Sequence, residues 1–205
     1  MERRLAPTPF PEKLTEAVAR DYPGAAEVAV SFPDNWSLVH RFSRGNTPLY
    51  IAGLPPSDEQ PSADHFFDLP PEINQSLTAY RKYRLFEPQT TYLFDVAWNT
   101  YTGAGHIIGG GGLRVHLHSL GQAQVWTGET DAILWECFLY ETRCGGINWQ
   151  AELATFWQAV EADIPANTIF TLPHEPSYPE GYPDFLQRLG YAPDPEFTSW
   201  WRKVR

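Results

Sequence analysis

Large apolar residues recur at helical spacing in the C-terminal third of the chain. Between positions 149 and 163 they are separated by three or four residues, which places them on one side of a helix. They are Trp149, Leu153, Phe156, Trp157 and Val160. The pattern predicts a helix with one buried face over Trp149–Asp163.

Upstream of this helix the pattern is typical of strands. Runs rich in β-branched and aromatic residues, bounded by turn residues, predict four strands. These are Tyr92–Asn99, Leu113–Leu120, Gln122–Trp126 and Ala132–Tyr140. The segment Thr127–Thr130 predicts a turn between the last two strands. We expect these strands to form a largely antiparallel sheet.

Prolines interrupt the pattern in the first ninety residues, so the elements predicted there are short. They are a helix over about Glu12–Arg20, strands over Glu27–Phe32, Trp36–Phe42 and Leu49–Gly53, a proline-rich surface loop over Leu54–Pro71, and a helix from Pro70-Pro71 to about Tyr83.

After the long helix we expect a strand at Thr168–Leu172, a short helix at Gly181–Leu189 and a closing strand at Phe197–Val204. Within that closing strand, Trp200 and Trp201 must face opposite ways. The predicted fold class is α/β (α+β), with a central mixed, largely antiparallel sheet and flanking helices. The 205 residues suit a single domain, 1–205, with a divergent N-terminal part over 1–90 and a core over 91–205.

Composition narrows the classes of function. The chain is 42% hydrophobic, which suffices for a core, and its formal net charge of −10 disfavours nucleic acid as a partner. We find no apolar run of the length that a signal peptide or a membrane span needs. The two cysteines, Cys137 and Cys144, do not form a CxxC pair. We expect a cytoplasmic protein with no membrane partner, and the oligomeric state stays open.

The segment between the last predicted strand and the long helix is a candidate phosphate site. It reads Arg143, Cys144, Gly145, Gly146, Ile147 and Asn148. A glycine turn that leads into a helix N-terminus directs unpaired N–H groups and a positive dipole end at one point. The alternative is an ordinary glycine turn in which Asn148 caps the helix. Glu152, in the first turn, would repel a diphosphate if it faced that way.

Arg143-x-x-Gly146-x-Asn148 resembles the Arg/Gln-x-x-Gly-x-Gly/Ala motif of the GNAT superfamily of N-acetyltransferases. Downstream, the segment from Phe185 to Tyr191 resembles the end of that family's short helix, and a closing strand follows. The resemblance covers about Leu113 to Arg205. Two positions depart from the family pattern: Asn148 replaces a small residue, and Leu186 stands where the family often has the tyrosine that protonates the departing thiolate.

The resemblance implies acetyl-CoA as cosubstrate, with its diphosphate on the backbone of Cys144 to Asn148. The pantetheine arm would then run between two diverging strands and pair with the main chain near Phe138 and Tyr140. The implied acceptor is a small-molecule or peptide amine. Retention of the fold for binding alone, without catalysis, is the competing hypothesis.

An amine acceptor must lose a proton, and Glu136 is our candidate for the base because it lies among apolar residues of a strand. Simple alternation would place Glu136 on one face with Leu134 and Phe138, and Trp135 and Cys137 on the other. Neither face would then be cleanly polar.

Two further segments carry candidate chemistry. His116 and His118 share a face of a predicted strand and, with Gln122, resemble the first metal-binding motif of the cupins. The second cupin motif is missing, so we expect no metal and regard two histidines on a solvent-facing edge strand as the ordinary alternative. His174 and Glu175 follow a predicted strand end and are candidate substrate residues, unless the segment is only a proline-stiffened loop.

Overall fold

The structure is a computed structural model that describes residues 14–22, 28–31, 36–57, 71–93, 96–99, 102, 104–107, 112–140, 149–165, 169–173, 181–197 and 199–204. The elements run in the order α1 (Leu14–Asp21), β1 (Val28–Ser31), β2 (Ser37–Arg44), β3 (Thr47–Gly53), α2 (Pro71–Ser76), β4 (Ala79–Leu93), β5 (Val96–Asn99), β6 (Ala104–Ile107), β7 (Gly112–Thr127), β8 (Asp131–Leu139), α3 (Trp149–Ala162), β9 (Ile169–Pro173), α4 (Tyr182–Arg188), β10 (Ala192–Pro193) and β11 (Trp200–Val204).

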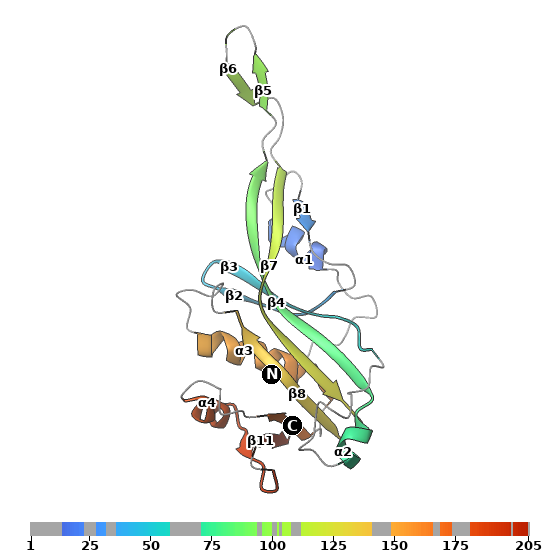
Figure 1. The fold of residues 1–205 in the computed structure, drawn as a ribbon. Coiled ribbons are helices and arrows are strands. Elements are labelled where there is room, and N and C mark those ends of the chain that lie inside the picture. Colours follow the sequence, from blue (N-terminus) through green and yellow to red (C-terminus); the bar gives the residue numbers. More distant parts are fainter. Residues whose placement is uncertain are drawn as a thin grey trace.

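A mixed sheet organises these elements (Figure 1). Its strand order is β10-β11-β9-β8-β7-β4-β3-β2, and β1 pairs with β7 beside this path. Among the described pairs, β1 with β7 and β8 with β9 are parallel, and the others are antiparallel. The predicted mixed, largely antiparallel sheet with flanking helices is confirmed.

Strand β7 is the centre of this sheet. The segments Leu113–Leu120 and Gln122–Trp126, expected as two strands, are one strand that pairs with β4 along its length. Beyond the body of the sheet, β4 and β7 continue as a ribbon, and the separate β5–β6 hairpin lies past its end (Figure 1). The single strand expected over Tyr92–Asn99 therefore falls partly on β4 and partly on β5.

The helix expected from Pro71 to about Tyr83 is much shorter than predicted. Helix α2 ends at Ser76, and β4 begins at Ala79. The residues after it follow a period of two, because Tyr83 and Leu85 are fully buried while Arg84 between them is only half-buried. Pairing with β7 outweighs the helical spacing of Ile73, Leu77 and Tyr80 that suggested the longer helix.

Alternate residues of β3 enter two different cores, because helices cover both faces of the sheet. Leu49 and Ile51 pack in one core with the α3 residues Phe156 and Trp157. Tyr50 and Ala52 pack in a second core with Leu14 and Val18 of α1. We call the first side the α3 face and the second the α1 face. The apolar run in β3 follows from this double coverage, as in strands that are buried on both sides.

The predicted elements of the C-terminal region are present with adjusted ends. Helix α3 has the buried stripe predicted for 149–163, since Leu153, Phe156, Trp157 and Val160 are all buried. Trp200 and Trp201 face opposite ways as expected, because they enter different hydrophobic clusters. Within the described residues, no helix combines the length and the apolar character needed to cross a bilayer.

A buried polar network holds α3 against the C-terminal strands. The indole Nε1 of Trp157 donates to the Tyr191 hydroxyl at 2.8 Å, and that hydroxyl donates to the Glu161 carboxylate. Lys203 Nζ donates to Glu161 Oε2 and to the Leu189 carbonyl oxygen, both at 2.9 Å. Each buried polar group thus has a partner, so the network joins α3 to the end of α4 and to β11 without an unpaired charge.

Burial, followed by the neighbouring Glu161 carboxylate, raises the pKa of Tyr191, so the phenol stays protonated in the fold well above pH 10. In the unfolded chain a tyrosine loses its proton near pH 10. The contribution of Tyr191 to the free energy of unfolding is therefore fully present below about pH 10. Above that pH it falls by about 1.4 kcal/mol per pH unit.

In the wild type the free energy of unfolding should fall as the pH rises from about 10 to about 11. We expect Tyr191→Phe to make this fall less steep, by about 1.4 kcal/mol per pH unit. Urea unfolding at several alkaline pH values measures it. The exposed substitution Glu129→Ala is the control and should keep the wild-type slope. Equal slopes in wild type and Tyr191→Phe would contradict the assignment.

Candidate functional site

Strand β8 contains one residue more than the segment of β7 with which it pairs. Pairing with β7 runs in register from Thr127 with Ala132 to Val125 with Leu134, and it then shifts so that Gln124 pairs with Glu136. Trp135 is therefore the inserted residue of a β-bulge. A bulge bends the strand and increases its twist, and it commonly redirects a side chain at a functional site.

The bulge separates Glu136 from Leu134, with which simple alternation would group it, while Phe138 stays on the same face as Glu136. Leu134 is buried in the core of the α3 face, and Cys137 packs against that core. Glu136 instead lies on the α1 face, where its carboxylate meets side chains of β7. The inserted residue resets the alternation between Leu134 and Glu136, but Phe138 still shares the face of Glu136, so neither face of this strand is cleanly polar.

Strands β8 and β9 part at the same point. Their parallel pairing covers Asp131 with Ile169 through Ile133 with Thr171. β8 then continues to Leu139 along β7, while Leu172 and Pro173 of β9 pair with β11. Within the described residues, the edge of β8 that faces β9 has no strand partner from residue 134 to residue 139. Backbone N–H and C=O groups on such an edge can bind an extended ligand.

Two glutamine side chains of β7 hold Glu136. Gln124 Nε2 donates to Glu136 Oε2 at 2.6 Å, and Gln122 Nε2 donates to the same oxygen at 3.0 Å. The Gln124 amide oxygen in turn accepts from the Tyr80 hydroxyl at 3.0 Å. Gln124 is therefore fixed in one orientation, with its nitrogen toward Glu136. In the part of the chain that the structure describes, both hydrogen bonds to Glu136 reach Oε2, and Oε1 has no described partner.

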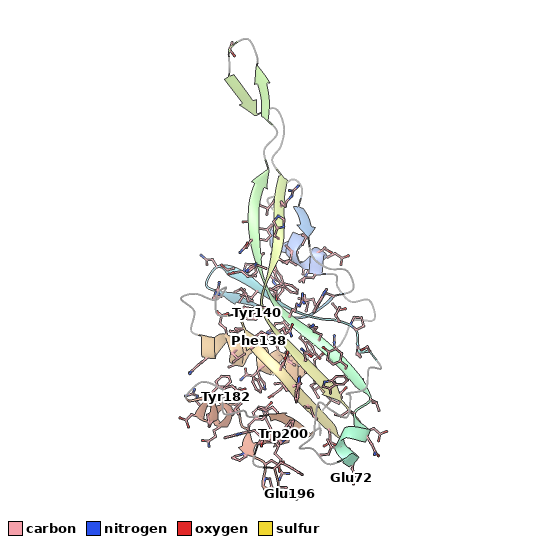
Figure 2. All side chains as sticks on the ribbon, viewed as in Figure 1. Glu72, Phe138, Tyr140, Tyr182, Glu196 and Trp200 are labelled. Atoms are coloured by element: carbon pink, nitrogen blue, oxygen red, sulfur yellow. The ribbon has the colours of Figure 1, made fainter. Side chains whose placement is uncertain are left out.

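Phe138 and Tyr140 lie at the end of β8, two and four residues after Glu136 (Figure 2). Their rings make an edge contact with centroids 5.3 Å apart. Phe138 is 37% exposed, a high value for a large apolar side chain. Gly121 of β7 allows the close approach here, because a Cβ at that position would meet the backbone oxygen of Phe138. The strand end thus combines an exposed ring with an adjacent carboxylate.

The other candidate residues fall into two groups. Arg143, Cys144, Gly145, Gly146, Ile147 and Asn148 lie outside the described residues, as do His174 and Glu175. Leu186 is on α4 and fully buried in the core. His116 and His118 are on β7, His116 exposed and His118 half-buried. Among the described residues, no group of three or more potential metal-ligating side chains comes together.

An ion-pair cluster lies at the first turn of α3. Arg44 pairs with Glu87 of β4, and its Nη1 is 3.6 Å from Glu152 Oε1. Burial raises the pKa of Glu152, and the attraction of Arg44 only partly offsets it. Because Glu152 faces Arg44, its charge is opposed by a cation at the helix start, which answers the concern that it would repel a ligand phosphate there.

Cys137 offers no nucleophile. Burial raises the pKa of its thiol, so the sulfur is protonated at neutral pH. A covalent relay through a cysteine needs the thiolate form. The described part of the site therefore suits a direct transfer better than a relay through Cys137.

The sequence did not predict Gln122, Gln124 and Tyr80 as partners of Glu136, and Gln122 was considered only within the cupin-like motif. Gln122 and Gln124 alternate with buried Ala123 and Val125, a period-two signal that places the glutamines on one polar face. Counting back from the turn, however, pairs Gln124 with Trp135, because the bulge has no signature in the sequence. The partners of Glu136 are visible only in three dimensions.

No protein-family model matches the chain, and no curated protein matches it in sequence.

The cluster at the start of α3 predicts opposite effects for its two carboxylates. Burial raises the pKa of Glu152, so the fold disfavours its charged form at pH 7. Glu152→Gln removes this charge, so the melting temperature at pH 7 should stay equal or rise. The gain should vanish near pH 4, where Glu152 is protonated in the unfolded chain as well. Glu87→Gln breaks the main pair of Arg44 and should cost about 1.5 kcal/mol at pH 7. Thermal unfolding at both pH values measures both. A loss in Glu152→Gln as large as that in Glu87→Gln would contradict the assignment.

Proposed function

We propose that the chain is an acyl-CoA-dependent N-acyltransferase of GNAT type that transfers an acetyl group from acetyl-CoA to a primary amine. One observation carries the proposal: at the Trp135 bulge, β8 leaves its parallel neighbour β9 and presents Glu136 on a face beside an unpaired strand edge. A thioester on that edge would lie within reach of an amine at Glu136.

The arrangement of β8, α3 and β9 supports this placement of the cosubstrate. β8 and β9 are parallel neighbours, and α3 connects them. The pantetheine arm has the extended form that suits the edge of β8 near Phe138 and Tyr140. The segment from Arg143 to Asn148 leads into the start of α3, where helix N–H groups and the dipole favour a diphosphate.

The proposed chemistry needs a base, and Glu136 supplies it. The Glu136 carboxylate accepts one proton from the ammonium, and the freed nitrogen lone pair attacks the thioester carbonyl carbon. Backbone N–H groups of the open β8 edge can stabilise the resulting oxyanion. The C–S bond then breaks, and the departing thiolate takes the second amine proton through water. The products are the amide, the free thiol and the proton held on Glu136.

Two features of the chain's own residues shape this scheme. The protonated thiol of Cys137 favours direct attack over a covalent relay. Leu186, at the position of the family's usual acid, is buried and has no proton to give. Water therefore relays the second amine proton to the thiolate in our proposal.

Thermal shift measurements test the cosubstrate. Acetyl-CoA at about 100 times its dissociation constant should add about 2.7 kcal/mol to the stability of the fold, and CoA alone should add a similar amount. The absence of a shift with acetyl-CoA and with other acyl-CoA thioesters would refute the proposal.

Glu136→Gln tests the base. We expect it to leave the shift with acetyl-CoA intact but to lower turnover by about 10²-fold or more. Glu72→Gln is the matched control, because Glu72 is an exposed carboxylate on α2 (Figure 2). Turnover by Glu136→Gln at the wild-type rate across pH would exclude Glu136 as the base and leave the cosubstrate proposal standing.

The buried Leu186 also favours a second candidate, a protein that keeps the fold for binding without catalysis. A shift with acetyl-CoA together with no thiol release from any amine tested would support this candidate over the enzyme.

A further inference from the structure

The α1 face carries an ordered grid of side chains across three neighbouring strands. Register places one residue each from β4, β7 and β8 in three rows. The rows are Arg84, Gln122 and Phe138, then Lys82, Gln124 and Glu136, then Tyr80, Trp126 and Ile133. The middle row contains the candidate base, so neighbouring grid residues would contact whatever binds there.

The third row is aromatic. The rings of Tyr80 and Trp126 lie against each other with centroids 4.6 Å apart. Tyr80 and Trp126 are only half-buried, and half-buried Trp135 belongs to the same apolar cluster. The hydroxyl of Tyr80 bonds to Gln124, which bonds to Glu136, so this aromatic pair and the carboxylate belong to one fixed network. A flat or large apolar group fits this row.

The residues that one strand contributes to the three rows form a column of the grid. The β4 column contains two cations, Lys82 and Arg84, without a described anionic partner. Arg41, Arg44 and Arg81 each pair with a carboxylate. Lys82 and Arg84 have no ion pair within the described residues, and the buried Nε of Arg84 lacks a hydrogen-bond acceptor there. The guanidinium of Arg84 lies over the Trp36 ring, with its carbon 5.3 Å from the ring centroid, so its described partner is aromatic and not anionic. In a chain with 25 acidic and 15 basic residues, two cations without a described anion, beside an unbonded donor, indicate a place for an external anion.

The column of Gln122 and Gln124 separates these cations from Glu136. Two strand spacings, about 10 Å between backbones, lie between the β4 and β8 columns. A lysine side chain can span more than half of that gap. A ligand that carries both a negative and a positive charge can therefore contact the β4 cations and Glu136 together.

We propose that this grid binds an α-amino acid with an aromatic or large apolar side chain. Its ammonium lies at Glu136, its carboxylate at Lys82 and Arg84, and its side chain on the Tyr80–Trp126 pair. The role of this ligand as acetyl acceptor rests on the proposed function, but its binding does not. The proposal excludes a polyamine, which has no anion for the β4 column and no ring for the third row.

Calorimetric titration of the full chain with L-phenylalanine, without acetyl-CoA, tests the binding. We expect phenethylamine, which lacks the carboxylate, and spermidine to bind at least about tenfold more weakly, a difference of about 1.4 kcal/mol. Lys82→Met and Trp126→Ala should each weaken L-phenylalanine about tenfold or more, and Lys82→Met should not weaken phenethylamine. Circular dichroism confirms that each variant is folded. Arg114→Met removes an exposed cation of β7 outside the grid and should bind as the wild type does.

The outcomes separate this inference from the proposed function. No binding of L-phenylalanine by the folded wild type, or equal binding of phenethylamine, overturns the inference. Acetyl-CoA-dependent turnover of spermidine but not of L-phenylalanine overturns it while the acyltransferase proposal stands. Binding of L-phenylalanine that Lys82→Met weakens, together with no effect of acetyl-CoA, supports the inference and refutes the acyltransferase proposal.

Discussion

The candidate site depends on the single inserted residue at Trp135. Without it, Glu136 would follow Leu134 onto the α3 face, where an unpaired carboxylate costs several kcal/mol. The insertion places the carboxylate on the opposite face, against two glutamine amides, and keeps Cys137 in the core. β8 also loses its pairing with β9 just before this point. The bulge thus sets the face on which Glu136 lies, and it immediately follows the point at which pairing of β8 with β9 ends.

Helix α3 connects β8 to β9 and packs on the sheet against β8 and β2. Polar contacts fasten its C-terminal half on two sides. Asp163 pairs with Arg81 and accepts from Tyr83 at 2.9 Å, both on β4. Glu161 binds Tyr191 and Lys203 in the C-terminal segment. Arg44 opposes the Glu152 charge at its first turn. These contacts tie the helix and the residue that follows it to β2, β4 and the C-terminal segment.

Patterns with a strong period predicted most of the fold. The buried stripe of α3 and the strands on either side of the Thr127–Thr130 turn needed only spacing and turn residues. The long helix after Pro71 was wrong because Ile73, Leu77 and Tyr80 mimic helical spacing, while long-range pairing with β7 decides the structure. Glu136 was identified correctly as a strand residue among apolar neighbours. Its partners could not be predicted, because one inserted residue changes every pairing after it and no residue type marks the insertion.

The central position of β7 has a consequence for how the chain acquires this structure during synthesis. β1, near the N-terminus, pairs in parallel with residues 113–116, so it emerges long before its neighbour exists. β4 can pair early with β3, but its other edge stays open until β7 follows the β5–β6 hairpin. Such non-local pairing slows folding and leaves strand edges exposed while the chain is incomplete. The growing chain can therefore pair β2, β3 and β4 before β7 exists, and β7 then supplies the partner that β1, β4 and β8 share.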